Sequence, residues 1–433
     1  MRILWLTNHI LPDHAIALGR KPLPIGGWMP ALADALMETH QLELGIATNV
    51  PDCLWSKKQI NGKTFFTIPI SKRINYQSLP LSIVQVYQRA INEFNPDIIH
   101  IHGTEYFHGL LTGRKHIECP TVISIQGIID VCKQHYWGGI SFGNLIKSRT
   151  LRDWIRIDGL IEQKFRWYRR AKWEREIFKT NMAFIGRTQW DLAHTRRMNP
   201  SARYYYCDQL LRAPFYETNW NINNINRHTI YASSASYPLK GFHTLIKAVS
   251  LLHQEFSDIT VKTPLASFYH TDIGMQRLWK NLRSGGYAKY LTDLIKEEGV
   301  GDHILQLGKI DAETVAEELK KAHVFVLPSF IENSPNALAE AMLVGTPSVT
   351  SFVGGVPSMV NDGESALCFP AGDSALLAEQ IRRIFLDDDL ANTLSIQGRK
   401  TAIIRHSKER ITKQMIKIYE DVNANAQTKR VGI

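Results

Sequence analysis

Short apolar runs alternate with helical patterns along this chain of 433 residues, and the alternation begins twice. In the first half, longer amphipathic stretches separate the apolar runs, which is typical of a parallel sheet with helices on both faces. The runs predict strands at 2–7, 42–48, 64–70, 97–102 and 121–126, and the stretches predict helices at 27–39 and 80–94.

The pattern begins again after a polar stretch, ETNWNINNINR, which is typical of a linker. We therefore expect two Rossmann-like α/β domains, at 1–215 and 228–405, joined by a linker at 216–227 and followed by a terminal segment at 406–433. In the second domain we predict strands at 228–233, 258–262, 303–306 and 323–327 and a helix at 240–255, and in the terminal segment a helix at 407–424.

Composition places the chain among ordinary globular proteins, with 44% hydrophobic and 21% charged residues. Its five cysteines are scattered and lack the spacing of a zinc site or a disulfide framework, so we expect reduced thiols. No apolar run reaches the roughly 18 residues of a membrane-spanning helix, and the start, MRILWLTNHILP, lacks the pattern of a signal peptide. The expected location is the cytoplasm, at most on the inner face of a membrane.

The stretch 331–346, IENSPNALAEAMLVGT, predicts a loop and a helix directly after the strand at 323–327. Ser334 suits the N-cap and Pro335 the first helical position. The N–H groups of such a helix attract a diphosphate, and here they belong to Asn336, Ala337 and Leu338.

Two carboxylates flank this predicted anion site. Glu332 lies in the loop, and Glu340 lies roughly 10 Å further along the helix at about 1.5 Å per residue. The pair suits a ligand with hydroxyl groups at both ends, a sugar on one side and a ribose on the other.

The Glu-x7-Glu pattern is followed by Gly345-Thr346-Pro347, Gly354-Gly355-Val356-Pro357 and Asp362-Gly363. Together these motifs, over roughly 320–370, resemble the family-4 retaining glycosyltransferases of GT-B fold, the glycosyl transferases group 1. The alternative is an amphipathic Rossmann helix with two exposed glutamates, which the order of the turn glycines disfavours. The resemblance implies two Rossmann-like domains that face each other across a cleft, with the last helix crossing back to the first domain.

By this resemblance Glu332 and Lys240 are catalytic. Lys240, in Leu239-Lys240-Gly241, opens a helix after a strand and would neutralise the donor diphosphate, although a surface lysine beside a turn is the alternative. The family also uses an arginine here, where this chain has Ser233-Ser234-Ala235-Ser236, and Arg187 is a candidate substitute.

The resemblance assigns further donor contacts to backbone groups. Gly308 and Lys309 would hold the nucleobase, and Gly354 and Gly355 would bring main chain close to the cleft. The family's glutamate after Gly-Gly-x-Pro is replaced by Ser358.

Two motifs of the first half resemble the same family. Gly26 and Gly27 correspond to its glycine loop, although a plain loop is the alternative, and His102 to the histidine near the reacting sugar. His100 shares a strand face with His102 and is expected to be packed. A metal site at this His-x-His would need Glu105 or His108, and the family is metal-independent.

Net charge is +10, and the excess gathers between 147 and 175, where Lys and Arg are interleaved with five aromatic residues. Such a stretch suits an anionic membrane surface. It could instead be a solvated helix face with its aromatics packed inward, or contact nucleic acid, although no nucleic-acid motif accompanies it.

We therefore predict a retaining, metal-independent enzyme without a cofactor. It would move a hexose from a nucleotide diphosphate sugar, a UDP-sugar ahead of a GDP-sugar, to a saccharide or lipid-linked saccharide in polysaccharide or glycoconjugate biosynthesis. The rivals are a nucleotide-sugar epimerase or other GT-B enzyme and a catalytically weak nucleotide-sugar-binding protein. A dinucleotide-dependent oxidoreductase is disfavoured, because no Gly-x-Gly-x-x-Gly follows 2–7 or 228–233.

Overall fold

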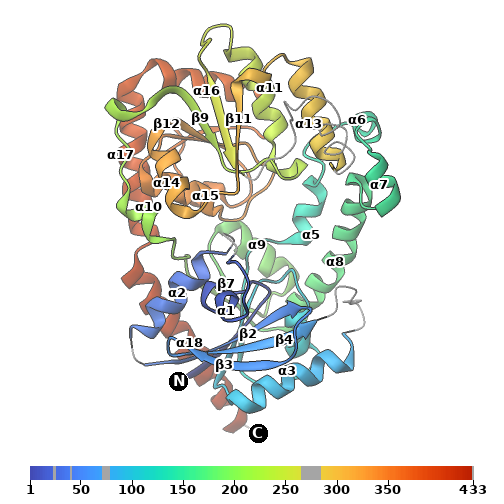
Figure 1. Ribbon diagram of the computed structural model, residues 1–433. Helices are drawn as coiled ribbons and strands as arrows, with labels where there is room; N and C mark the ends of the chain where they lie inside the picture. The colour runs from blue at the N-terminus through green and yellow to red at the C-terminus, as the bar shows by residue number, and fades with distance from the viewer. Residues whose placement is uncertain (23–25, 40, 71–78, 265–283, 432–433) are drawn as a thin grey trace. The chain divides into compact units, whose positions relative to one another are not determined.

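The structure is a computed structural model that describes residues 1–22, 26–39, 41–70, 79–264 and 284–431. It divides into two compact units, each built on its own β-sheet (Figure 1). Unit 1 consists of Met1–Asp130, Arg169–Arg212 and His406–Ile433, and unit 2 of Val131–Tyr168 and Ala213–Arg405.

Unit 1 contains an eight-stranded sheet in the order β3-β4-β2-β1-β5-β6-β7-β8. All neighbouring strands are parallel except β3, which pairs antiparallel with β4 at the edge. The strands are β1 (Arg2–Thr7), β2 (Glu43–Pro51), β3 (Ser56–Ile60), β4 (Lys63–Ile70), β5 (Ile98–His102), β6 (Thr121–Ser124), β7 (Ala183–Gly186) and β8 (Arg203–Tyr206).

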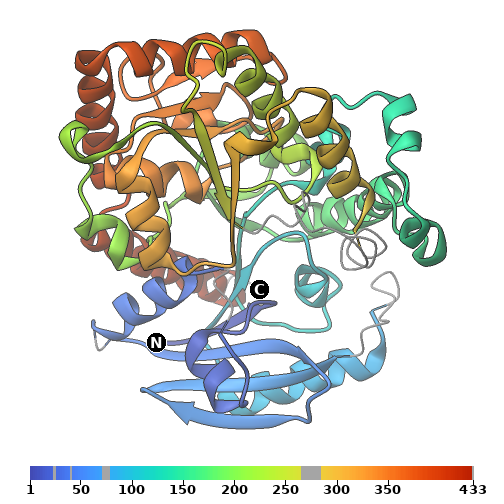
Figure 2. The same ribbon diagram turned by 45° about the horizontal axis from the view of Figure 1, so that its top comes forward.

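Helices cover both faces of this sheet, with α3 on one face and α2 and α18 on the other (Figures 1 and 2). The helices of unit 1 are α1 (Pro12–Ala17), α2 (Trp28–Met37), α3 (Leu81–Phe94), α4 (His108–Gly113), α9 (Gln189–Met198) and α18 (Lys408–Val431), while α5 (Ile129–Cys132) and α8 (Leu160–Thr180) run from one unit into the other.

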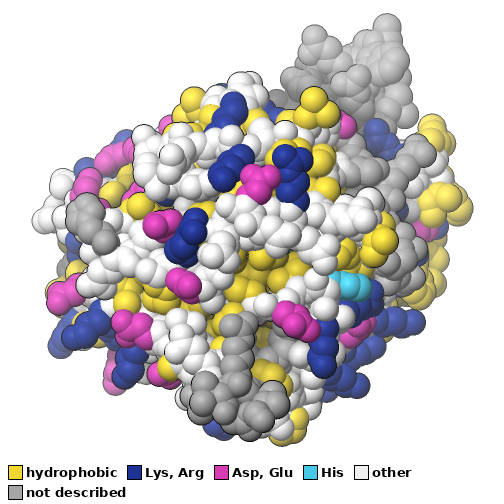
Figure 3. All heavy atoms as spheres, turned by 90° about the horizontal axis from the view of Figure 1, so that it is seen from below, with side chains coloured by type: hydrophobic (Ala, Val, Ile, Leu, Met, Phe, Trp, Pro, Cys, Tyr) yellow, Lys and Arg dark blue, Asp and Glu magenta, His cyan; other side chains and the backbone are white. Residues whose placement is uncertain are grey.

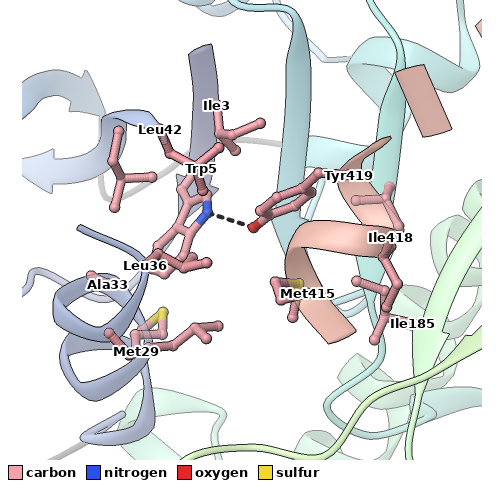
Figure 4. Close-up of a cluster of buried hydrophobic side chains, with 14 of the residues drawn as sticks. Ile3, Trp5, Met29, Ala33, Leu36, Leu42, Ile185, Met415, Ile418 and Tyr419 are labelled. Atoms are coloured by element: carbon pink, nitrogen blue, oxygen red, sulfur yellow. Dashed lines mark hydrogen bonds between the residues drawn. The ribbon is translucent and has the colours of Figure 1, made fainter. Parts of the chain in front are cut away.

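The last helix, α18, belongs to unit 1 although it follows unit 2 in the chain. Its Met415, Ile418 and Tyr419 are buried in a hydrophobic cluster with β1 and α2 (Figure 4). The indole Nε1 of Trp5 donates to the Tyr419 hydroxyl at 3.1 Å, so the polar tips of both buried rings are paired. Burial of these large side chains fixes the end of the chain on the first sheet.

Unit 2 contains a six-stranded parallel sheet in the order β11-β10-β9-β12-β13-β14. This is the doubly wound order of a Rossmann domain. Its strands are β9 (Asn226–Ala232), β10 (Thr260–Pro264), β11 (Ile304–Gly308), β12 (Ala322–Leu327), β13 (Ser348–Ser351) and β14 (Leu367–Phe369), and its helices are α6 (Phe142–Lys147), α7 (Leu151–Arg156), α10 (Ala213–Glu217), α11 (Phe242–Leu252), α13 (Gly286–Glu297), α14 (Ala312–Lys321), α15 (Asn336–Val344), α16 (Ser374–Leu386) and α17 (Asp388–Arg405).

The two-sheet α/β architecture expected from the sequence is confirmed, but two predicted boundaries are wrong. Val131–Tyr168 was expected in the first domain and instead groups with unit 2. The reason is packing: His243 bonds the Gly138 carbonyl, and Trp167 contacts Tyr237 at a ring distance of 6.4 Å.

The predicted linker at 216–227 is also wrong, because much of this range is packed on unit 2. Trp220 is buried, its main-chain N–H donates to the Val344 carbonyl, and its indole N–H donates to the Ala322 carbonyl. The polar composition of the stretch misled the prediction, since Trp220 anchors it on unit 2.

Across the residues that the structure describes, no helix is both long and apolar enough to cross a bilayer.

Candidate active site

The strand order of unit 2 reverses between β9 and β12, so the loops after these two strands diverge. In a parallel α/β sheet, ligands bind in the crevice that this divergence creates at the carboxyl ends of the strands. The loop after β9 carries Lys240 and the loop after β12 carries Glu332. The topology therefore brings together two residues that are 92 positions apart in the chain.

Lys240 and Glu332 form an ion pair at this point. The Lys240 ammonium donates to Oε1 of Glu332 at 2.6 Å, and the Ser329 hydroxyl donates to the same oxygen at 2.7 Å. The two side chains are only 24% and 11% exposed, so the pair is largely shielded from water. A charge pair in such surroundings is stronger than one at the surface.

The ion pair favours the protonated form of Lys240. Burial opposes the charge of Lys240, but the Glu332 carboxylate and the nearby Tyr237 hydroxyl outweigh it and raise the pKa of the lysine. Burial raises the pKa of Tyr237 as well. Lys240 is therefore a cation throughout the physiological range and is available to an anionic ligand.

Helix α15 begins next to Glu332, but one residue later than expected. Pro335 occupies the N-cap with extended backbone angles, and Ser334 is not the cap; its hydroxyl points to the sulfur of Met359 instead. Proline cannot donate a helical hydrogen bond, so it suits the residue before the first turn.

The free N–H groups at the start of α15 are fewer than the sequence indicated. Leu338 donates to the Pro335 carbonyl at 3.2 Å, which leaves Asn336 and Ala337 as the groups without an intrahelical acceptor. These two amides lie at the N-terminus of the helix, the end that carries partial positive charge. Their predicted role in binding an anion stays a prediction.

Glycines position the loops that carry the pair. At Gly241, φ is +69° and a β-carbon would lie 1.8 Å from the Pro328 carbonyl oxygen, so the loop after β9 can touch the loop after β12 only with glycine there. Gly354 likewise packs on Glu332, and the Gly355 N–H donates to the Glu332 carbonyl at 2.9 Å. Gly354 and Gly355 therefore both support the main chain of Glu332.

Sequence reasoning missed the segment 131–141 as part of this site. A β-carbon on Gly138 would lie 2.3 Å from the Pro238 carbonyl oxygen, two residues before Lys240. Burial lowers the pKa of His243 to about 4, so the ring is neutral and donates from Nε2 to the Gly138 carbonyl. Phe330 stacks on His243 at 5.6 Å. The only sign of this contact in the sequence is the doublet Gly138-Gly139. In the structure both of these glycines have positive φ.

The remaining predicted donor residues of unit 2 lie where the fold expects them. Glu340 is half-buried at the centre of α15. Gly308 ends β11 with φ of +71° and open space where a β-carbon would be, and Lys309 after it is exposed. Their contacts with a nucleotide stay predictions.

Unit 1 has a similar reversal of strand order, between β1 and β5. Gly26 and Gly27 lie in the loop after β1, where Gly26 has φ of +72° and packs near Met29 and His9. A β-carbon on Gly27 would lie 2.4 Å from Cδ of Arg212. The glycine loop thus has a basic side chain across it that sequence reasoning did not identify.

The His-x-His of β5 divides into a packed and an unpaired histidine. Nδ1 of His100 lies 2.8 Å from the Tyr419 hydroxyl and Nε2 lies 2.7 Å from the Ser124 hydroxyl, so both nitrogens are engaged. His102 is 5% exposed, contacts the Trp5 and Trp28 rings, and has no hydrogen bond at either nitrogen within the described residues. Burial, with the neighbouring histidines, holds the pKa of His102 well below its usual range. A neutral, unpaired imidazole can bond a hydroxyl group.

Arg187 follows β7 in unit 1 and is 4% exposed. Its guanidinium donates to the Ile125 and Gln126 carbonyls at 3.1 and 3.3 Å. It therefore has a structural role within unit 1, and its predicted role toward the diphosphate stays a prediction.

Two doubly wound units, with a lysine, a carboxylate and a helix N-terminus at the switch point of the second, are the architecture of the GT-B fold. Residues 217–401 match the family described as Glycosyl transferases group 1. The matched range contains the whole Lys240–Glu332 loop system.

Similar proteins agree with this assignment. The chain is 30% identical to N-acetyl-alpha-D-glucosaminyl L-malate synthase of Bacillus anthracis over 30% of its own length and 34% of that protein. It is 31% identical to phosphatidyl-myo-inositol mannosyltransferase of Mycobacterium leprae over 31% and 36% of the two chains. The matches thus span about a third of the length of these curated relatives.

Solved structures share the fold over almost the whole chain. Sucrose-phosphate synthase from Thermosynechococcus elongatus superposes with a TM-score of 0.73 at 18% identity, covering 98% of this chain and 100% of that one. The Anabaena protein HepE, solved with UDP-glucose, gives 0.64 at 15% identity, with coverage of 98% and 100%.

Proposed function

We propose that the protein is a glycosyltransferase that moves a hexose from a nucleotide diphosphate sugar to a saccharide acceptor in polysaccharide or glycoconjugate biosynthesis. The observation that carries the proposal is the Lys240–Glu332 pair beside the N-terminus of α15. A permanent cation and unpaired helix amides suit a diphosphate, and a carboxylate beside them suits sugar hydroxyls.

The positive groups would act on the leaving group. When the bond between the anomeric carbon and the diphosphate oxygen breaks, negative charge builds on the nucleoside diphosphate. The Lys240 ammonium and the N–H groups of Asn336 and Ala337 would stabilise that charge, as positioned donors do for developing anions elsewhere.

Glu332 would orient the sugar. Its Oε1 already accepts hydrogen bonds from Lys240 and Ser329, which lowers the nucleophilicity of the carboxylate. It is better suited to binding hydroxyls while positive charge develops at the anomeric carbon than to forming a covalent bond. We therefore favour transfer with retention in which the acceptor enters on the face that the diphosphate leaves, without a divalent metal.

The donor is proposed to be a UDP-sugar, with Glu340 on the ribose and the main chain at Gly308 and Lys309 on the base. The solved complexes of HepE with UDP and with UDP-glucose support this choice through the shared fold. In unit 1, His102 offers an unpaired imidazole for a sugar hydroxyl.

The acceptor is proposed to be a lipid-linked saccharide that the enzyme meets at an anionic membrane surface on the cytoplasmic side. One relative, phosphatidyl-myo-inositol mannosyltransferase, is named for a lipid acceptor. The basic and aromatic stretch between 147 and 175 would provide the attraction to the membrane.

The test is release of nucleoside diphosphate from a panel of UDP- and GDP-sugars, with the anomeric configuration of the product followed by NMR. The expected result is release from a UDP-hexose that increases with a saccharide acceptor and gives a product of unchanged configuration. Conversion of the donor into an epimer without release would replace the proposal with an epimerase. Saturable binding without any turnover would leave a nucleotide-sugar-binding protein.

A further inference from the structure

Helices α6 and α7 expose all their apolar side chains except Leu145, which is unusual for a surface helix. On α7, Leu151, Trp154 and Ile155 occupy one face and are 61%, 62% and 73% exposed. On α6, Phe142 and Ile146 are four positions apart and are 59% and 53% exposed. We call these five residues the α6–α7 wedge.

Three polar side chains of this segment are buried. Asp153 is 1% exposed and forms a capping box with Thr150, which is also buried. Ser148 is buried and donates to the Leu145 carbonyl. The fold therefore uses polar residues to hold α7 in place, and the apolar face is left to water.

A strained residue keeps one more apolar side chain on this surface. Ile157 ends α7 with φ of +50°, a conformation that a β-branched residue rarely adopts. Its side chain is 64% exposed, and its carbonyl accepts a hydrogen bond from Arg166 at 2.7 Å. Glycine or asparagine would be relaxed here, so the isoleucine has no explanation in the packing of the isolated protein.

Within the segment 142–168 itself, the exposed charge has one sign. Asp153, Asp158 and Glu162 are the acidic residues of 142–168, none is exposed, and each pairs with Arg149 or Arg152. The exposed cations of the same segment are Lys147, Arg156 and Arg166. Elsewhere, as on the face seen in Figure 3, acidic and basic side chains lie beside one another.

Among the residues of unit 2 that the structure describes, α13 lies next to α6 and leaves the apolar side chains of the wedge exposed. In Figures 1 and 2, α6 and α7 lie outside α13, on the side away from the six-stranded sheet. Asp293, Glu297 and Glu298 on α13 line a hollow of about 300 Å³, but the α6 residues that border it are Asn144, Lys147 and Ser148. The acidic groups therefore face the polar side of α6.

The aromatic residues of the basic stretch confirm this division. Trp167 is half-buried against Tyr136 at a ring distance of 4.9 Å, whereas Phe165 and Tyr168 are 64% and 44% exposed. Part of the stretch thus packs within unit 2, and the rest adds to the exposed apolar area beside the wedge.

We propose that the α6–α7 wedge inserts into the interface of an anionic bilayer, with Lys147, Arg156 and Arg166 on the lipid headgroups. Large apolar patches on a soluble surface mark a binding partner, and an apolar centre with an aromatic residue and a basic rim fits the membrane interface. This assigns the membrane docking proposed above to particular residues, and it does not depend on the donor chemistry of Lys240 and Glu332.

The experiment is co-sedimentation of the full chain with vesicles of phosphatidylcholine alone or mixed with phosphatidylglycerol. The wild type should bind the mixed vesicles, and raised salt should weaken that binding. The double variant Trp154→Gln/Ile155→Gln should bind at least about tenfold more weakly, because it removes two apolar side chains from the wedge. A tenfold loss corresponds to about 1.4 kcal/mol. Lys147→Glu/Arg156→Glu should also lose binding.

The matched control is Leu251→Gln/Leu376→Gln, which removes two exposed leucines of unit 2 outside the wedge. It should bind vesicles as the wild type does. Donor hydrolysis in solution should be unchanged in the wedge variant, which shows that it is folded and separates this test from that of the donor site.

Three outcomes would overturn the proposal. They are indifference of the wild type to both kinds of vesicle, equal binding by the wedge and control variants, and concentration-dependent self-association that the wedge variant abolishes while vesicle binding is absent. The last would make the wedge an interface between two copies of the chain.

Discussion

Gly354 lies against the main chain of Glu332, because a β-carbon at position 354 would stand 2.0 Å from the Glu332 carbonyl oxygen. The next residue, Gly355, donates its N–H to the same oxygen. The loop after β13 therefore holds the carboxylate that the proposed function places on the sugar. The glycine motif that was expected to bring main chain close to the cleft also supports the main chain of Glu332.

Gly354→Ala should displace the loop that carries Glu332. The substitution should cost about 1–3 kcal/mol of unfolding free energy from overpacking, with roughly 1–2 kcal/mol more from its φ of +53°. Denaturant unfolding measures the first effect, and the initial rate of donor turnover should fall by more than the stability loss explains.

Gly363→Ala is the matched control, because Gly363 has φ of +77° but nothing within 4 Å of the added carbon. It should show only the conformational cost and near-normal turnover. Equal losses of activity in the two variants would mean that Gly354 acts through backbone conformation alone.

Lys240→Met and Glu332→Gln should each lower kcat/KM, because each removes a group that meets developing charge. The loss should correspond to about 2–4 kcal/mol of transition-state stabilisation. The double variant should lose less than the sum, since the two side chains are paired at 2.6 Å. Steady-state kinetics on all four proteins gives the coupling.

The pair Lys262–Glu318 offers a control with similar burial, at 2.7 Å and with exposures of 16% and 18%. Lys262→Met should leave kcat/KM near the wild-type value. An equal loss in Lys262→Met would indicate a general effect of breaking an ion pair in unit 2.

Much of the architecture could be predicted from the sequence because both sheets are buried and parallel. Continuous apolar runs such as 2–7 and 323–327 became β1 and β12 within a residue of the expected bounds. The edge strand β3, SKKQI, was missed because it is largely exposed and lacks an apolar pattern. β8, RYYY, was missed for a similar reason, since none of its residues is buried.

The site was predictable where it depends on one loop and a helix, and not where it depends on packing between distant segments. Glu332 and Lys240 lie on motifs that mark strand–loop–helix units. The contact of Gly138 with Pro238 joins positions 100 residues apart, and no local sequence pattern predicts it. The N-cap of α15 was placed one residue too early because Ser334 is a common capping residue whose hydroxyl here bonds Met359.

Glycosyl transfer should survive exhaustive chelation of divalent metal. The diphosphate would already meet a permanent cation in Lys240, whose pKa is raised by Glu332, and the amides at the start of α15. The measurement is turnover in excess chelator against turnover with added manganese or magnesium. Activity that disappears with the chelator and returns with either metal would contradict the expectation.

Buried histidines should make unit 1 sensitive to acid. Burial lowers the pKa of His100 and His108 to about 3 and, with Lys58, that of His14 to about 4. In the unfolded chain each pKa is about 6.5, so below that pH the unfolded state binds more protons than the folded state. Stability is therefore complete above about pH 6.5 and falls as the pH falls toward the folded values, by up to about 1.4 kcal/mol per pH unit for each histidine.

His108→Gln should reduce this slope by about one proton, as measured by urea unfolding between about pH 4.5 and 7. Asn49 Nδ2 lies 3.0 Å from Nε2 of His108, and the Tyr87 hydroxyl lies 2.8 Å from the same nitrogen. The Tyr87 hydroxyl donates to Oδ1 of Asn49 at 2.7 Å, and the Asn49 amide can donate to Nε2 of His108 only when the ring is neutral. Tyr87→Phe, which disturbs the same network without removing an imidazole, should lower stability at every pH and keep the wild-type slope. A slope that is unchanged in His108→Gln would show that His108 is already neutral in the unfolded chain or protonated in the folded one.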